Sequence, residues 1–152
     1  MKKIYGLFLI LTLGIFALGI LINRANALLY IDFASLIIVV VPALILLLSN
    51  FSWKEMGASF SIGFKKGPSE EELEKGLLFF EAAQKYLLYS GFIGLMIGLI
   101  VLIGALGENS EGVASGFSLS LVTVLYALIL VLVVVFPFKH GIKKRLIEAG
   151  LS

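Results

Sequence analysis

Residues 86–107 read YLLYSGFIGLMIGLIVLIGALG, a run of 22 residues without a charged side chain. A helix rises about 1.5 Å per residue and about 20 residues cross the hydrocarbon core, so the run is long enough to span a bilayer. Lipid offers backbone groups no hydrogen-bond partner, which favours a helix. The run also lacks the alternating polarity of a strand in a membrane barrel. It therefore predicts a transmembrane helix.

Three more runs share this property, and the whole chain is 60% hydrophobic and 14% charged. The additional uncharged runs are 4–22, 33–53 and 112–138. This composition predicts an all-α membrane protein with four transmembrane helices. The chain has 152 residues, so we expect a single membrane domain with a cytoplasmic segment at 54–85 and a cytoplasmic tail at 139–152.

The first run has a second interpretation. Lys2 and Lys3 precede it and Ala25-Asn26-Ala27 follows it, which is the pattern of a secretory signal peptide. The run is longer than the usual apolar core of about 7–15 residues, and Arg24 lies directly before the supposed cleavage site. We therefore expect a retained helix, with cleavage as the alternative.

The placement of Lys and Arg predicts the orientation. With four spans, all but one of the 12 Lys and Arg residues fall on one side of the membrane, and only Arg24 falls on the other. The loop between the third and fourth spans carries Glu108 and Glu111 and no basic residue. Basic loops stay in the cytoplasm, so we expect both termini there.

The segment 54–85 carries the signals of a helix start. Gly67-Pro68 interrupts it, and Ser69 with Glu72 three residues later forms a capping-box pattern. We expect one long helix from about Glu70 through the third span, partly protruding from the membrane. Its apolar face packs against the amphipathic stretch 56–64 in our interpretation, and docking of a cytoplasmic partner is the alternative.

Several kinds of site are not expected. The chain has no cysteine and one histidine, which excludes disulfides and argues against a zinc site. No nucleophile–base pair or phosphate loop is present, so we expect no enzyme and no cofactor. The net charge of +2 is too small to suggest nucleic acid. No Asp, Glu, Lys, Arg or His lies inside the four runs, and Asp32 only borders the second. Ion movement through lipid normally needs such a group, so either the chain moves no ions or a partner supplies the carboxylate.

Small residues form two stripes at helical spacing. The stripe of the third span consists of Gly91, Gly94 and Gly98. The stripe of the fourth span consists of Gly116, Ser120, Thr123 and Ala127. Such stripes let helices approach closely, either within one subunit or against a partner helix. In the second case Ser120 and Thr123 are the polar groups nearest its ion-carrying side chain. Two prolines are expected to shape the helices: Pro42 kinks the second, and Pro137 ends the fourth.

Three segments resemble the A-subunit of the bacterial flagellar stator, MotA/PomA, within the MotA/TolQ/ExbB proton-channel group. The segment YIDFASLIIVV (30–40) is similar to the start of the family's second span. The family pattern there is an aromatic residue followed by [IV]-D-x-x-S-[LI]-[LI]-I-V-V. GFIGLMIGLI (91–100) is similar to G-L-I-G-T-V-x-G-L-I of the third span. SLVTVLYA (120–127), with Pro137 later, resembles A-L-L-T-T-L-Y-G of the fourth.

The resemblance implies a stator-like subunit of a motor driven by ion-motive force in the bacterial inner membrane. It implies a homopentamer of this chain around two copies of a single-span, MotB/ExbD-like partner, whose aspartate carries protons or sodium ions. The third and fourth spans then line the central pore. Ser120 and Thr123 belong to its ion pathway, and the glycines with Ala127 pack against the partner helix.

The chain also departs from the family pattern. Leu95 and Val124 stand in the places of two threonines. The family's Pro-Thr pair is Leu88-Tyr89, its glycine pair in the second span is Val41-Pro42, and its cytoplasmic domain shrinks to 54–85. These departures keep a second hypothesis open, a non-conducting membrane scaffold that holds a partner helix.

Overall fold

The computed structural model describes residues 4–22, 31–107 and 110–150. Every regular element in this part of the chain is a helix. The elements are α1 (Ile4–Ile22), α2 (Phe33–Asn50), α3 (Trp53–Ile62), α4 (Glu70–Ala105), α5 (Ser110–Leu130), the π-helix η2 (Val131–Val135) and α6 (Phe136–Glu148). The features at Lys2, Lys3, Arg24, Ala25-Asn26-Ala27 and Glu108 lie outside the described residues.

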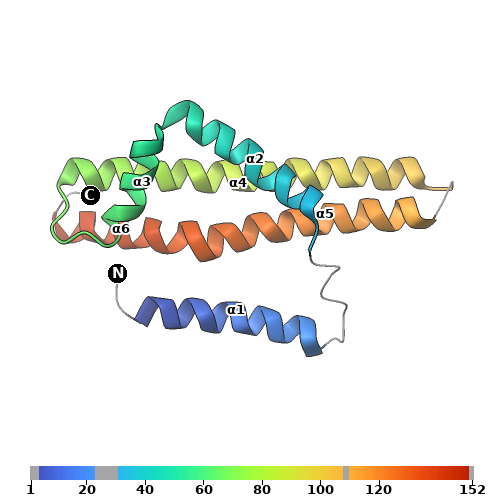
Figure 1. Cartoon of the computed structure of the whole chain (residues 1–152), viewed down its shortest axis with the longest axis horizontal. Helices are drawn as coiled ribbons and strands as arrows, with labels where there is room; N and C mark the ends of the chain where they lie inside the picture. Colours follow the sequence, from blue (N-terminus) through green and yellow to red (C-terminus); the bar gives the residue numbers. More distant parts are fainter. Residues whose placement is uncertain (1–3, 23–30, 108–109, 151–152) are drawn as a thin grey trace.

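Two long antiparallel helices form the body of the molecule. Figure 1 shows α4 lying along the continuous helix made by α5, η2 and α6. The 36 residues of α4 correspond to about 54 Å, whereas the hydrocarbon core measures about 30 Å. The single helix α4 is therefore long enough both to cross a membrane and to extend beyond it.

The start of α4 confirms the capping signal. The Ser69 hydroxyl accepts from the Glu72 N–H at 3.3 Å, and a Glu72 carboxylate oxygen accepts from the Ser69 N–H at 3.0 Å. Gly67 before it has φ +64°, a left-handed conformation that a side chain rarely adopts. The loop thus reverses the chain and delivers it to α4 at Glu70.

The expectation that Pro137 ends the fourth helix is wrong. The helix runs without interruption from Ser110 to Glu148 and includes part of the expected tail. The physical reason lies in the preceding turn, which is a π-helix: the Phe136 N–H bonds to Val131 O, five residues back. This wider turn lets Pro137, which has no N–H, enter the next turn as a helix start.

The second helix begins and ends with polar side chains. The Asp32 carboxylate caps α2 by accepting from the N–H groups of Ala34 and Ser35. The helix continues through Pro42 and ends at Asn50, short of the expected Trp53. Ser52 and Glu55 then form a second capping box, so Trp53 is the first residue of α3.

An aromatic cluster joins α3, the first half of α4 and α6. Phe60 makes edge contacts with Phe79 and Phe80 at ring distances of 5.7 and 5.2 Å. Phe138 of α6 stacks on Phe80 at 5.1 Å. Phe79 and Phe80 are almost fully buried. The amphipathic stretch 56–64 therefore packs against α4 within the chain, which is the packing interpretation of the sequence.

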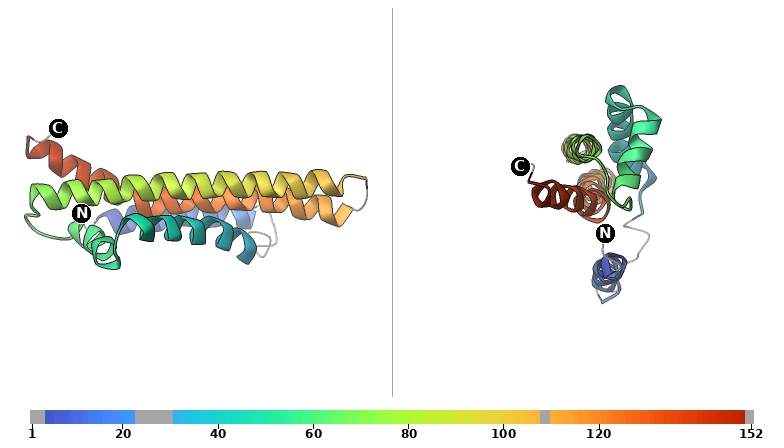
Figure 2. Two further views of the ribbon diagram at one scale, coloured as in Figure 1. Left: turned by 90° about the horizontal axis from the view of Figure 1, so that it is seen from above. Right: turned by 90° about the vertical axis from the view of Figure 1, so that its left-hand side faces the viewer.

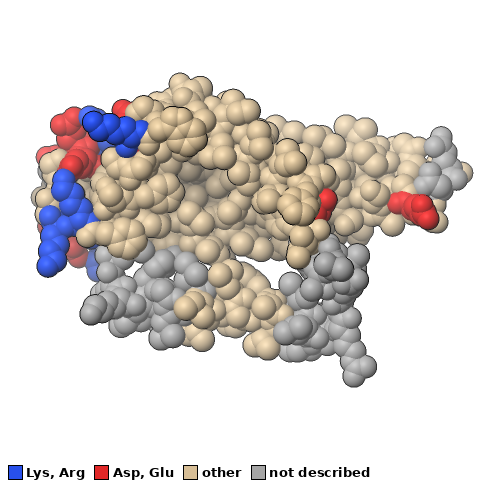
Figure 3. All heavy atoms as spheres, viewed as in Figure 1, with Lys and Arg blue, Asp and Glu red and all other residues tan. Residues whose placement is uncertain are grey.

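The charged side chains divide the molecule into two ends. We call α3, the first half of α4 and α6 (53–85 and 139–148) the charged end, because every Lys and Arg in the described residues belongs to it. Figure 3 shows the visible Lys and Arg gathered there. Three helical stretches of the described chain are long and apolar enough to cross a membrane: α2, α4 and the helix from Ser110 to Glu148. The apolar helix α1 lies apart from them (Figure 2).

Candidate functional site

The two stripes of small residues face each other across α4 and α5. A Cβ placed on Gly91 would lie 2.4 Å from Ala127 Cβ, and one on Gly94 would lie 2.6 Å from Thr123 Cγ2. At Gly98 it would lie 2.5 Å from the Ser120 backbone nitrogen. Real Cβ atoms do not approach this closely. The two backbones are therefore in contact because these positions carry small residues.

Gly116 closes the outer part of this contact. A Cβ there would lie 2.4 Å from Leu102 N and 2.8 Å from Gly98 O. The family-like segments 91–100 and 120–127 thus form a single interface, and Gly116 extends it toward Leu102. All seven residues predicted from the two stripes come together within one chain.

The two hydroxyls of the predicted ion pathway are buried in this interface. Thr123 has no exposed surface and Ser120 has 1%. Thr123 Oγ1 lies 2.9 Å from Leu119 O and 3.1 Å from Ser120 O, and Ser120 Oγ donates to Gly116 O at 2.8 Å. Ser120 Oγ also lies 3.3 Å from Leu95 O of α4. Both hydroxyls are satisfied by backbone carbonyls in this arrangement. Their contact with an ion or a partner helix stays a prediction.

Val124 occupies a different face from Thr123. It lines an apolar groove of about 360 Å³ on the surface of the α4–α5 pair. The groove residues are Leu88, Tyr89, Gly91, Phe92, Val124, Ala127 and Leu128. Val124 stands where the family pattern has its second threonine. The open face of the pair therefore lacks the hydroxyl that the family pattern would place there.

A polar contact between α2 and α5 was not foreseen from the sequence. The backbone N–H of Asp32 donates to Tyr126 Oη at 2.9 Å. The Asp32 carboxylate meanwhile bonds to Ala34 N, Ser35 N and the Ser35 hydroxyl. A tyrosine in an apolar helix needs a partner for its hydroxyl, which was the available signal. The contact joins two of the three family-like segments.

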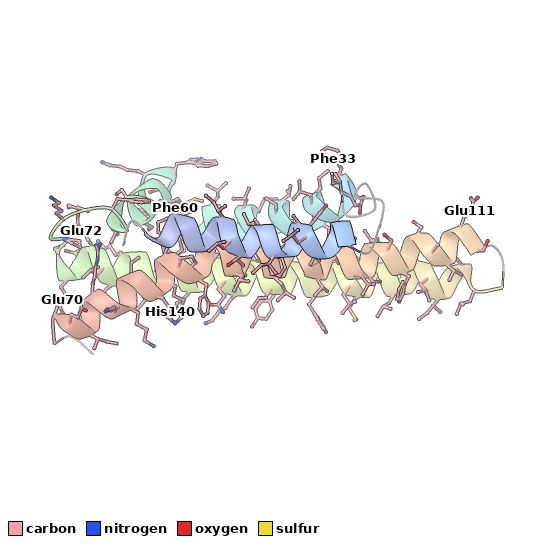
Figure 4. All side chains as sticks on the ribbon, turned by 90° about the horizontal axis from the view of Figure 1, so that it is seen from below. Phe33, Phe60, Glu70, Glu72, Glu111 and His140 are labelled. Atoms are coloured by element: carbon pink, nitrogen blue, oxygen red, sulfur yellow. The ribbon has the colours of Figure 1, made fainter. Side chains whose placement is uncertain are left out.

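This contact also sets the position along α5 at which α2 begins. Tyr126 lies 16 residues after the start of α5, about 24 Å along the helix. Asp32 is therefore level with the interior of α5, and Figure 4 shows Phe33 well inward of Glu111 along the bundle. Asp32 borders the second span as expected, but α4 and α5 extend beyond it. Its carboxylate is occupied by capping bonds.

Ionisable contacts between α4 and α6 lie at the charged end. Lys139 Nζ is 3.3 Å from a Glu81 carboxylate oxygen and 3.0 Å from Gln84 Oε1. Among the described residues no group of three His, Cys, Asp or Glu side chains could hold a metal ion. The apolar parts of α2, α4 and α5 offer packed small residues. Within the described residues, these parts carry no Asp, Glu, Lys, Arg or His side chain.

Comparison with known proteins assigns the chain to a family. The model of the MotA/TolQ/ExbB proton channel family matches residues 66–149, which is more than half of the chain and includes all of α4, α5, η2 and α6. A search of individual curated proteins returned no match. The matched range contains the whole α4–α5 interface. The chain therefore belongs to the MotA/TolQ/ExbB proton channel family.

Proposed function

We propose that this chain is the pore-forming subunit of a membrane complex driven by ion-motive force. In this proposal five copies surround a single-span, MotB/ExbD-like partner, and the partner's aspartate carries the protons or sodium ions. The observation that supports it best is the family match over the closely packed α4–α5 pair. Four spans, including α1, and a charged end in the bacterial cytoplasm complete the proposed topology.

The proposal gives the ion-carrying group to the partner for a physical reason. A charge at the centre of a bilayer costs at least about 2.5–3.5 kcal/mol, so an ion needs a group that neutralises or relays it. Hydroxyls such as Ser120 and Thr123 cannot take up a proton at neutral pH. The Asp32 carboxylate is bonded to the start of α2. In this proposal the α4–α5 pair therefore forms the wall around a carboxylate that another chain supplies.

A non-conducting scaffold is the second candidate. The groove beside Val124 supports it, because its lining is almost wholly apolar and offers an ion little to bind. In that case the pentamer holds a partner helix through the same face and moves no ions. A flagellar-type motor subunit, as the resemblance to MotA/PomA implies, is the more specific form of the first candidate.

A flux assay separates the two candidates. The protein is reconstituted in liposomes alone, with a single-span helix carrying one mid-span aspartate, and with the asparagine version of that helix. We expect proton or sodium flux only with the aspartate helix. Flux from the chain alone would refute the division of labour between the subunits. Absence of flux in all three samples, with a pentamer-sized complex by native mass spectrometry, would favour the scaffold.

A further inference from the structure

An open pocket of about 680 Å³ lies at the charged end, away from the α4–α5 interface. It is formed by the loop between α3 and α4 and by the last turn of α6, which Figure 1 places next to each other. The lining includes Phe64, Lys65, Lys66, Leu73, Arg145 and Glu148. The ion-conducting role proposed above makes no use of this pocket.

Two cations in this pocket lack an anionic partner among the described residues. Arg145 donates from both terminal nitrogens of its guanidinium to backbone carbonyls: Nη1 lies 2.9 Å from Ile62 O and 3.2 Å from Lys65 O, and Nη2 lies 3.3 Å from Gly63 O. These bonds hold the planar group in place without neutralising it. Lys66 forms no hydrogen bond or ion pair with the described part of the chain.

The remaining charges of the pocket are already paired. Lys65 Nζ lies 2.6 Å from a Glu72 carboxylate oxygen, and Lys144 Nζ lies 3.6 Å from Glu148. The positive charges of Arg145 and Lys66 are therefore the ones available to a ligand. A fixed guanidinium and a free ammonium in the lining of one pocket together match the charge of a phosphate dianion.

The size and the aromatic wall of the pocket favour an organic phosphate over inorganic phosphate. Its volume of about 680 Å³ is in the range of small-molecule sites and far exceeds the needs of a bare anion. Phe64 contacts Phe138 edge-on, yet 69% of its surface is exposed. An exposed phenyl ring in the same pocket as two cations offers a stacking surface for a planar group attached to the phosphate.

Most of the pocket lies beyond the lipid headgroups. Its wall at Phe64 contacts Phe138, the last residue of the fourth uncharged run. However, Arg145 follows Phe138 by seven residues of α6, or about 10 Å, and Leu73 precedes Tyr86 by 13 residues of α4, or about 20 Å. The headgroup layer is only about 5–7 Å thick on each side of a bilayer. We propose that the pocket formed by Phe64, Lys66 and Arg145 binds a soluble organic phosphate such as a nucleoside monophosphate.

Calorimetry on the full-length protein in nanodiscs tests this site. The probes are 5′-AMP and inorganic phosphate, and the nanodiscs are prepared with and without phosphatidylglycerol. We expect saturable binding of 5′-AMP, tighter than that of phosphate, in both lipid compositions. Lys66→Gln should weaken it about tenfold, because the phosphate loses a charge-assisted hydrogen bond. Phe64→Ala should bring 5′-AMP to the affinity of phosphate.

Lys143→Gln provides the matched control, since Lys143 is an exposed lysine of α6 that does not line the pocket. It should leave binding unchanged. Equal losses in Lys66→Gln and Lys143→Gln would show general charge attraction and overturn the site. Failure of 5′-AMP to bind, equal affinity of the two probes, or displacement of 5′-AMP by phosphatidylglycerol would each overturn it as well. None of these results bears on ion flux, so the proposed function is tested separately.

Discussion

Tyr126 of α5 and Asp32 at the start of α2 are joined by a hydrogen bond of 2.9 Å from the Asp32 backbone N–H to the tyrosine hydroxyl. The N–H of an N-cap residue has no partner inside its own helix. Tyr126 supplies that partner from a helix 94 residues further along the chain. The bond therefore sets the level at which α2 begins against α5.

Tyr126→Phe should destabilise the protein by about 0.6–1.7 kcal/mol, the range measured for hydrogen bonds between membrane helices. The ring is kept, so the loss reports the hydroxyl and the N–H left without it. Unfolding in mixed micelles by added SDS measures the change. Tyr89→Phe is the control, because Tyr89 is exposed and its hydroxyl has no partner in the described structure. Equal stability of the two variants would remove the structural role of this bond.

Gly98→Ala should force α4 and α5 apart. The new Cβ would lie 2.5 Å from the Ser120 backbone nitrogen and 2.7 Å from Gly116 O, and backbone atoms cannot swing aside. Overpacking of this kind costs about 1–3 kcal/mol. Gly104→Ala is the matched control on the same helix, since its Cβ would meet nothing within 4 Å. The same SDS titration measures both, and a Gly98→Ala protein as stable as Gly104→Ala would contradict the close approach.

Thr123→Val tests whether the buried hydroxyl has a role in ion movement. Valine keeps the shape that fills the space opposite Gly94, and the lost bonds go to carbonyls of the same helix. We therefore expect a folded complex of unchanged native mass with reduced flux in the liposome assay with the aspartate helix. Ser110→Ala, at the exposed start of α5, should leave flux unchanged. Equal flux from the two variants would assign Thr123 to packing alone.

Val124→Thr tests the apolar groove. This substitution places a hydroxyl on the open face of the α4–α5 pair, at the position where the family pattern has a threonine. If the groove faces the ion path, flux with the aspartate helix should rise several-fold, because a hydroxyl can coordinate a passing ion. Leu121→Thr, an exposed position of α5 outside the groove, should have no effect. A rise in both variants would argue for a general gain in polarity.

Acid should loosen the start of α4. The hydrogen bond from Lys65 is the main cause that holds the pKa of Glu72 below its ordinary value of 4.5, and the Ser69 N–H adds to it. A lowered folded-state pKa means that this contribution to stability is present above pH 4.5 and is lost as the pH falls through the lower value. Relative to the intrinsic exchange rate at each pH, which itself falls in acid, the hydrogen-exchange protection of residues 70–75 should therefore decrease below about pH 4.5.

Glu72→Gln should remove most of this acid response, since glutamine keeps the capping-box bond but cannot pair with Lys65. Glu74→Gln is the control, because Glu74 is exposed and has no ion pair within the described residues. An acid response that Glu72→Gln leaves intact would show that another group is responsible.

The sequence by itself determined the helical class, the long helix that begins at Glu70, and the residues of the two small stripes. These properties are local. Uncharged runs of about 20 residues have one low-energy solution in lipid, and a capping box is complete within four residues. The contact faces of the family-like segments could also be located from the sequence. Glycine and serine at helical spacing mark such a face whichever helix packs against it.

The tertiary structure decided what those faces contact. Spacing alone left the stripes open to a partner helix, whereas the structure packs Gly94 against Thr123 inside one chain. It also brought Tyr126 to Asp32 and carried the last helix past Pro137 through a π-turn. Each of these depends on where a second element lies or on a register shift within a helix. Such features are set by the fit of whole surfaces, which no short stretch of sequence contains.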